Sequence, residues 1–168
     1  MIHVCPLSRL TQTVTRTGAE HVLSVISPGT PVALPARVRR ENHLVVGCND
    51  IVAPQEGLIH PAVKHVEAIL DFARRWPRSA PLVVHCFAGI SRSAASAYIA
   101  VCALAPGRDE AEIARALRAA SPIVTPNALL IEIADAVLGR QGRMSAAIAA
   151  IGRGREAMES EPFEIRLT

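Results

Sequence analysis

Short runs of apolar residues alternate along the first half of this chain with a longer segment in which apolar residues recur at helical spacing. Three of the runs, at 22–26, 44–46 and 82–84, are rich in Val, Ile and Leu and predict β-strands. Strands that are apolar at nearly every position are typical of a parallel sheet that is covered on both faces. The pattern therefore favours an α/β fold.

The segment 61–76 predicts an amphipathic helix. Pro61 stands in its first turn, where proline is tolerated, and Pro77 ends it. A later segment, 93–104, is small and apolar on all sides and predicts a buried helix. The apolar residues at helical spacing in the first of these helices are Val63, Val66, Ile69, Leu70, Ala73 and Trp76.

Two further helices are indicated by their start signals. Asp109 is followed by Glu112 three residues later, which is the spacing of a capping box with Asp in place of the hydroxyl residue. Asn127 follows a proline and is a good N-cap for an apolar helix, for which Gly139 is a stop signal.

The length of 168 residues is enough for one domain and too short for two ordinary ones. Residues 141–168 predict an addition to that domain, with a helix at 144–151 and then a tail that alternates at Phe163, Ile165 and Leu167. The tail fits an edge strand or an interaction segment, and the sequence does not choose between them.

Composition excludes several classes of protein. A hydrophobic content of 50% excludes a disordered chain, and no apolar run reaches the roughly 20 residues that span a bilayer. The start of the chain lacks the basic and apolar regions of a secretion signal, so we expect a cytoplasmic protein. The net charge of +3 comes from scattered arginines, with Lys64 as the only lysine and 3% aromatic residues. A nucleic-acid binder has a basic stripe with interleaved aromatics, so we expect no nucleic-acid partner.

The four cysteines are Cys5, Cys48, Cys86 and Cys102, and they form no C-x-x-C pair. The six histidines are dispersed as well, so the sequence predicts no metal site. Disulfides are not expected in a cytoplasmic chain, which leaves a single reactive thiol as the hypothesis for cysteine chemistry.

One stretch carries the candidate chemistry. The buried strand at 82–84 leads into a turn from Cys86 to Arg92, and a helix follows. A loop between the end of a strand and the N-terminus of a helix points successive backbone N–H groups inward and forms an anion-binding nest. Gly89 gives the backbone of this turn the freedom to curl.

Arginine and cysteine give this turn its chemistry. Arg92 can hold two oxygens of a phosphate bidentately, and the same N–H donors favour the thiolate of Cys86. A nucleophile at the base of a phosphate cradle indicates attack on phosphorus. The same spacing recurs at Cys102 and Arg108, but there the cysteine lies late in a helical segment and no helix starts at the arginine.

The string His-Cys-x2-Gly-x2-Arg-Ser, from His85 to Ser93, resembles the signature loop of the cysteine-dependent protein tyrosine phosphatase superfamily. It is most similar to loops of the dual-specificity branch. The resemblance extends over about residues 20–138 through the order of strand, loop and helices and through the helix start at Pro126 and Asn127.

Carried over residue by residue, the resemblance makes Cys86 the nucleophile, Arg92 the phosphate clamp and Ser93 a hydroxyl that helps the thiolate to leave. His85 would order the loop and tune the thiol, and Asn127 would brace the loop or only cap its own helix. The backbone donors to the phosphate would come from the loop: Phe87, Ala88, Gly89, Ile90, Ser91 and Arg92.

The family also needs a general acid, usually an aspartate on a loop before the nucleophile. Asp50 lies 36 residues before Cys86 (86 − 50) and follows the strand at 44–46, so it is the candidate. Glu56, in the flexible run that comes next, competes for the role, and Asp50 also fits a turn residue that bonds its own backbone.

For the whole chain, the resemblance implies a central, mostly parallel sheet of four or five strands flanked by helices. Residues 1–140 would form the catalytic domain, with 141–168 as its C-terminal helical extension and tail. The implied activity is phosphomonoester hydrolysis through a cysteinyl-phosphate, without metal or cofactor, on a phosphorylated protein.

Several questions stay open at this point. Phosphotyrosine and phosphoserine or phosphothreonine both remain as substrates, although a signature loop without lysine argues against a polyphosphorylated lipid. The alternatives are a catalytically silent phosphate-binding module and a phosphatase for non-protein phosphates, with sulfur transfer or arsenate reduction ranked last. The sequence does not predict the oligomeric state.

Overall fold

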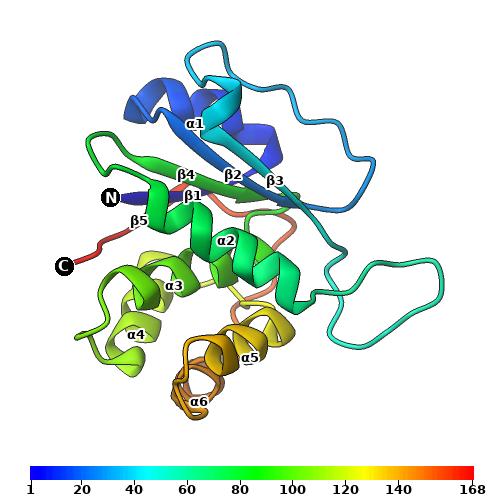
Figure 1. Ribbon diagram of the computed structural model, residues 1–168, viewed down its shortest axis with the longest axis vertical. Coiled ribbons are helices and arrows are strands. Elements are labelled where there is room, and N and C mark those ends of the chain that lie inside the picture. The colour runs from blue at the N-terminus through cyan, green and yellow to red at the C-terminus, as the bar shows by residue number, and fades with distance from the viewer.

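The computed structural model describes all residues, 1–168, and contains a central sheet with helices on both faces (Figure 1). The strands lie in the order β3-β2-β4-β1-β5, in which the first four are parallel and β5 is antiparallel to β1. The prediction of a mostly parallel α/β sheet of four or five strands is confirmed. The strands are β1 (Ile2–Pro6), β2 (His21–Ile26), β3 (His43–Gly47), β4 (Leu82–Cys86) and β5 (Phe163–Ile165).

The helices divide unequally between the two faces of the sheet. Helix α1 lies alone on one face, and the other five helices lie on the opposite face (Figure 1). The larger of two apolar cores is on the side of the five helices, and the smaller core lies beneath α1. The helices are α1 (Leu10–Thr17), α2 (Val63–Arg75), α3 (Arg92–Leu104), α4 (Glu110–Ala120), α5 (Ala128–Val137) and α6 (Arg143–Ile151), and two 3-10 turns are η1 (Leu7–Arg9) and η2 (Arg40–Asn42).

The three predicted strands are present, as β2, β3 and β4, but β3 is not covered on both faces. It is one of the two edge strands of the sheet, and Val45 is 52% exposed. The expectation that all three strands are covered on both sides is therefore wrong for β3. An apolar run predicts that a strand forms, but it is a weaker predictor of whether that strand lies at the centre or at the edge of the sheet.

Strand β1 and helix α1 were not predicted from the sequence. Strand β1 lies between β4 and β5, and its residues pair with β4 from Ile2 opposite Leu82 to Pro6 opposite Cys86. His3 interrupts its apolar run and proline ends it, so the local pattern is weak. The strand is specified by its neighbours in the sheet, which lie far away in the sequence.

Helix α2 begins at Val63, two residues after the predicted start at Pro61. Ala62 is extended (φ −145°), and its N–H donates to Nδ1 of His65 at 3.0 Å. This bond satisfies an N–H group outside the helix and fixes the entry of the chain. Helix α3 is buried from Arg92 to Cys102, as its small apolar sequence predicted.

The predicted caps of α4 and α5 are confirmed. Asp109 Oδ1 accepts a hydrogen bond from the N–H of Glu112 at 2.9 Å, and Asn127 Oδ1 accepts one from the N–H of Leu130 at 3.0 Å. Helix α5 ends shortly before Gly139, whose φ of +64° turns the chain toward α6.

The C-terminal part of the chain packs on this fold twice. Helix α6 lies against α4 and α5, and the segment after it returns to the sheet, where β5 pairs with β1. Of the two interpretations of the tail, the structure selects the edge strand. None of the helices combines the length and the apolar character that crossing a membrane requires.

Candidate active site

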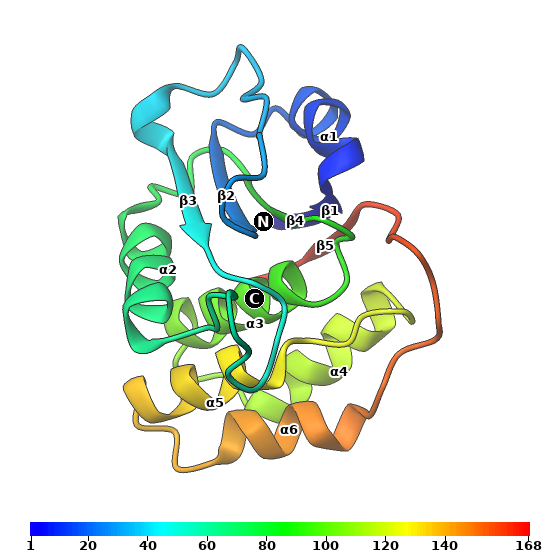
Figure 2. The ribbon, with the colours of Figure 1, turned by 90° about the vertical axis from the view of Figure 1, so that its right-hand side faces the viewer.

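The stretch that carries the candidate chemistry lies where β4 ends and α3 begins. Cys86 is the last residue of β4, Arg92 is the first residue of α3, and 87–91 connect them. All four parallel strands have their carboxyl ends at this edge of the sheet, which is the edge that faces the viewer in Figure 2. Open α/β sheets bind their ligands at this edge. We call residues 86–92 the signature loop.

The signature loop turns several carbonyl groups outward. In a trans peptide the N–H points away from the C=O, so the N–H groups next to these carbonyls point into the loop. One of these inward N–H groups, that of Gly89, donates to Cys86 Sγ at 3.2 Å. The outward bonds are those of Leu7 N–H to Phe87 O (3.1 Å), Ser160 N–H to Ala88 O (2.8 Å) and Thr125 N–H to Ile90 O (3.1 Å).

Cys86 Sγ lies at the base of this loop and is nearly inaccessible to solvent. Besides the N–H of Gly89, it lies 3.1 Å from the hydroxyl oxygen of Ser93. Gly89 itself has φ +72°, and a Cβ there would lie 2.7 Å from the nitrogen of Pro6 and 2.8 Å from the carbonyl carbon of Cys5. Glycine is required because β1 passes directly behind the loop.

Arg92 is buried, with only 5% of its surface exposed, and it is held from one side. Its Nη1 donates to the carbonyl oxygen of Cys48 at 2.7 Å and to Oγ of Ser27 at 3.1 Å. Its Nε is buried and has no hydrogen-bond partner, and it lies 3.9 Å from Oδ2 of Asp50. The guanidinium is therefore fixed in orientation and retains a buried donor for an oxyanion.

Asp50 lies beside the signature loop. Its Oδ1 accepts hydrogen bonds from Oγ of Ser91 at 2.7 Å and from Nδ2 of Asn127 at 2.8 Å. The carboxyl is thus oriented by the loop on one side and by the start of α5 on the other, while the side chain stays 38% exposed. Asn127 does two things, since its Oδ1 caps α5 and its Nδ2 holds Asp50.

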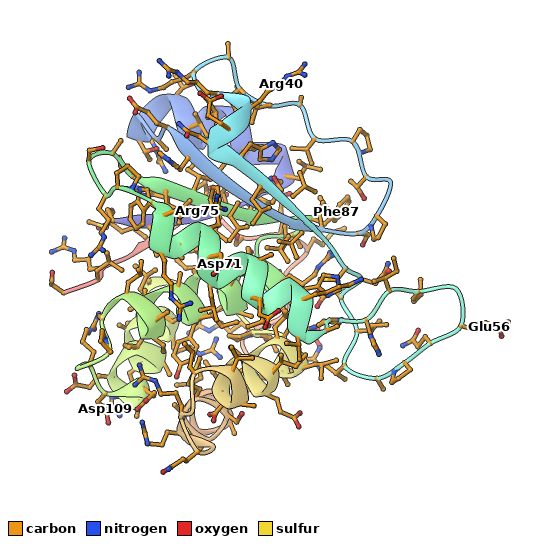
Figure 3. All side chains as sticks on the ribbon, viewed as in Figure 1. Arg40, Glu56, Asp71, Arg75, Phe87 and Asp109 are labelled. Atoms are coloured by element: carbon orange, nitrogen blue, oxygen red, sulfur yellow. The ribbon has the colours of Figure 1, made fainter.

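The structure separates the two candidates for the general acid. Glu56 lies at the outer end of the long connection between β3 and α2, far from the sheet (Figure 3). It is exposed and forms no hydrogen bond or ion pair. Only Asp50 contacts the signature loop. Phe87, also labelled in Figure 3, is 66% exposed at the rim of the loop.

His85 supports the loop from within the sheet. Its Nδ1 lies 3.4 Å from the carbonyl oxygen of Cys86, and its Nε2 lies 2.6 Å from Oγ of Ser24, which is also 2.8 Å from Nε2 of His43. A carbonyl only accepts, so Nδ1 carries the proton, Nε2 accepts from Ser24, and His43 donates to Ser24. Burial lowers the pKa of His85 to about 4, which keeps the ring neutral at neutral pH.

The other thiols near the site differ from Cys86 in their surroundings. Burial raises the pKa of Cys48 to about 11 and that of Cys5 to about 12. Both are therefore protonated at neutral pH and neither is a competing nucleophile. Cys48 nevertheless serves the site, because its carbonyl oxygen accepts from Arg92.

Sequence reasoning missed three polar residues of this site: Ser24, Ser27 and His43. Ser24 stands in the middle of an apolar strand and is fully buried, and a polar residue in such a run is a signal of an internal hydrogen bond. Ser27 follows that strand immediately, at the edge where ligands bind. No group of three or more His, Cys, Asp or Glu side chains is arranged to hold a metal ion.

Comparison with models of protein families finds no match, and comparison with curated proteins finds none. Solved structures do match. DUSP15 superposes with a TM-score of 0.63 at 19% identity, covering 89% of this chain and 89% of that protein. Human DUSP28 gives 0.62 at 20% identity (83% and 94% covered), and the PTP-2 phosphatase of Cydia pomonella gives 0.61 at 19% (80% and 84% covered).

These similarities establish the fold, because they extend over most of each chain while the sequences differ at four positions in five. The chain has the protein tyrosine phosphatase-like fold in the form found in dual-specificity phosphatases. The resemblance of fold that the signature loop implied is confirmed.

Proposed function

We propose that this protein is a cysteine-dependent phosphatase that hydrolyses phosphomonoesters of proteins. The observation that carries the proposal is that three groups lie together at the signature loop. The N–H of Gly89 donates to Cys86 Sγ, the buried Nε of Arg92 has no hydrogen-bond partner within the protein, and the Asp50 carboxyl lies 3.9 Å from that Nε. This is the donor set for a phosphate above a thiolate, with an acid at the rim.

The proposed reaction has two steps. The thiolate of Cys86 attacks phosphorus, the bond between phosphorus and the leaving oxygen breaks, and the Asp50 carboxyl gives its proton to that oxygen. Water then attacks the cysteinyl-phosphate, Asp50 takes a proton from the water, and the bond between phosphorus and sulfur breaks. Ser93, 3.1 Å from Sγ, donates a hydrogen bond to the departing thiolate, and inorganic phosphate is released.

Two features support a phosphoprotein as substrate. The signature loop carries no lysine, so it offers no extra charge to a polyphosphorylated headgroup. Phe87 stands exposed at the rim of the loop and offers an apolar contact to the residue that carries the phosphate. Phosphotyrosine is the first substrate to test, and phosphoserine and phosphothreonine are the second.

The test is hydrolysis of para-nitrophenyl phosphate and of an alkyl phosphate, both in EDTA, by the wild type and by four variants. Cys86→Ser is expected to remove activity, while Cys102→Ser, which changes a buried cysteine of α3 outside the signature loop, is the matched control that keeps it. Asp50→Ala is expected to lower kcat about 10²- to 10⁴-fold with a poor leaving group such as an alkyl phosphate. Glu56→Ala is expected to leave it unchanged.

The outcomes separate the candidate functions. A folded wild type that turns over none of these esters would contradict the enzyme, and binding of a phosphopeptide without turnover would then assign the fold to a phosphate-binding module. Equal activity of the wild type and Asp50→Ala on the alkyl phosphate would contradict only the role of Asp50 as general acid. The proposed phosphatase activity would stand.

A further inference from the structure

The segment between α6 and β5 runs along the signature loop. We call residues 152–162 the C-terminal strap. Figure 2 shows it leaving α6, passing along one edge of the face that carries the signature loop and ending at β5. Three of its backbone N–H groups bond to other parts of the fold: Gly154 N–H to Thr125 Oγ1 (3.0 Å), Arg155 N–H to Pro122 O (3.0 Å) and Ser160 N–H to Ala88 O (2.8 Å).

A cavity of about 540 Å³ lies between the strap and the connection from α4 to α5. Its wall includes Ile90 of the signature loop, which is four residues after Cys86. Ile123 and Thr125 come from the connection, and the remaining lining residues come from positions 153–158 of the strap. The cavity therefore borders the phosphate-binding loop, and its volume suits a large side chain.

The walls of this cavity are held in place. Nη1 of Arg118 donates to the carbonyl oxygens of Pro122 (2.9 Å) and Val124 (2.8 Å), and its Nη2 donates to that of Gly152 (2.7 Å). One guanidinium thus ties the two walls together. Gly154 allows their close approach, because a Cβ there would lie 2.6 Å from the carbonyl oxygen of Val124. A site whose walls are fixed before binding pays less ordering entropy when it binds.

The lining combines positive charge with apolar surface. Arg153 and Arg155 are exposed, and neither forms an ion pair or a side-chain hydrogen bond with the rest of the chain. Glu156 is the only acidic residue in the lining, so the charge of the cavity is positive by one. Ile90 and Ile123 supply apolar contact. The cavity is complementary to a side chain with an apolar stem and an anionic end.

We propose that this cavity binds a second anionic side chain of a phosphopeptide, a carboxylate or a phosphorylated residue close to the one that is hydrolysed. The inference rests on the proposed phosphatase function and adds a substrate preference to it. The phosphorylated residue enters the signature loop, and the neighbouring acidic residue meets Arg153 and Arg155 beyond Ile90. A phosphopeptide is favoured over a lipid headgroup because the signature loop beside the cavity carries no lysine for a polyphosphorylated headgroup.

The experiment compares two peptides that share a central phosphotyrosine. In one the neighbouring residues on both sides are glutamates, and in the other they are glutamines. The ratio of kcat/KM for the two peptides is measured for each variant. The wild type is expected to prefer the glutamate peptide, and Arg153→Ala/Arg155→Ala is expected to lower this ratio on the order of tenfold, the loss expected for charged hydrogen bonds in a partly exposed site.

Two further variants make the result specific. Arg40→Ala/Arg115→Ala removes the same charge from exposed arginines that lie outside the cavity and form no ion pair, so it is expected to keep the wild-type ratio. Glu156→Gln removes the opposing carboxylate and is expected to raise the ratio. This variant tests the proposal in the opposite direction, even if the double arginine variant fails to fold.

Failure of this inference is distinguishable from failure of the proposed function. Absence of turnover of both peptides and of para-nitrophenyl phosphate contradicts the phosphatase. Turnover with the same peptide ratio in the wild type and Arg153→Ala/Arg155→Ala, or with no effect of Glu156→Gln, overturns the cavity proposal alone. Faster turnover of a soluble short-chain phosphoinositide than of the glutamate peptide, lost in the arginine variant, would assign the cavity to a lipid headgroup and overturn the peptide proposal.

Discussion

Replacing His85 by asparagine should remove the contribution of this histidine to the pH dependence of the free energy of unfolding. Burial lowers the pKa of His85 from its ordinary 6.5 to about 4. Between these values the unfolded chain binds a proton that the folded chain does not, so folding loses stability as the pH falls. The loss begins near pH 6.5, grows by about 1.4 kcal/mol for each pH unit and reaches roughly 3 kcal/mol near pH 4.

The variant behaves differently because asparagine does not titrate in this range. At neutral pH, His85→Asn should be less stable than the wild type by about 1–3 kcal/mol, since Ser24 loses its buried partner. Toward acid pH this deficit should shrink by roughly 3 kcal/mol, because only the wild type has a histidine at this position that takes up a proton on unfolding. The measurement is urea unfolding of both proteins at several values between about pH 7.5 and about pH 4.5.

Other histidines that are buried or partly buried do not obscure the comparison. Burial also lowers the pKa values of several that both proteins retain, so their contributions largely cancel in the difference between the two unfolding free energies. The control is His43→Asn. It removes the histidine at the other end of the His43–Ser24–His85 hydrogen bonds, and the ring of His43 is more accessible to solvent. A difference between wild type and His85→Asn that stays constant over the whole range would refute a neutral, buried His85. A ring proton of His85 that titrates near pH 6.5 by NMR would refute it independently.

Three substitutions test the rest of the site. Gly89→Ala should abolish turnover and destabilise the protein by about 3 kcal/mol or more, because φ is +72° and the backbone of β1 leaves no room for a methyl group. Ser93→Ala should slow hydrolysis of the cysteinyl-phosphate, seen as a burst of leaving group in rapid-mixing kinetics followed by a slower steady state. Asn127→Ala should lose about 1 kcal/mol of stability with its cap and also lower kcat for poor leaving groups, because it releases Asp50.

Each of these substitutions has a matched control. Gly29 has φ +81° but open space around it, so Gly29→Ala should show only the backbone cost, and equal effects at the two glycines would contradict the steric argument. Ser96→Ala removes a buried hydroxyl of α3 that bonds Arg92 O, and a burst in that variant too would make the effect of Ser93 non-specific. Asn127→Asp keeps a good cap and loses the donor to Asp50; wild-type kcat in this variant would refute the bracing role.

The signature loop was predictable in detail because its information is local. A strand of Val and Leu, a glycine in the turn and a helix of small residues lie within one continuous stretch, and each element follows from its own residues. The same holds for the caps at Asp109 and Asn127, where one side chain bonds the backbone three residues on.

The choice between Asp50 and Glu56 could not be made in this way. Both residues lie on the same connection between β3 and α2, at acceptable distances along the chain. In the structure Asp50 is held beside the signature loop by Ser91 and Asn127, which come from two other parts of the fold. Contacts of this kind depend on how the helices pack, so they cannot be predicted from the residues of the connection itself.

The sequence by itself therefore determined the elements with strong local patterns, the parallel α/β class and the turn from Cys86 to Arg92 that joins a strand to a helix. The tertiary structure decided that β1 lies behind Gly89, that Ser27 and Ser24 support Arg92 and His85, and that the C-terminal strap borders the signature loop. The physical reason is that periodicity and capping act over a few residues, whereas these contacts join segments far apart in the chain and exist only once the core has formed.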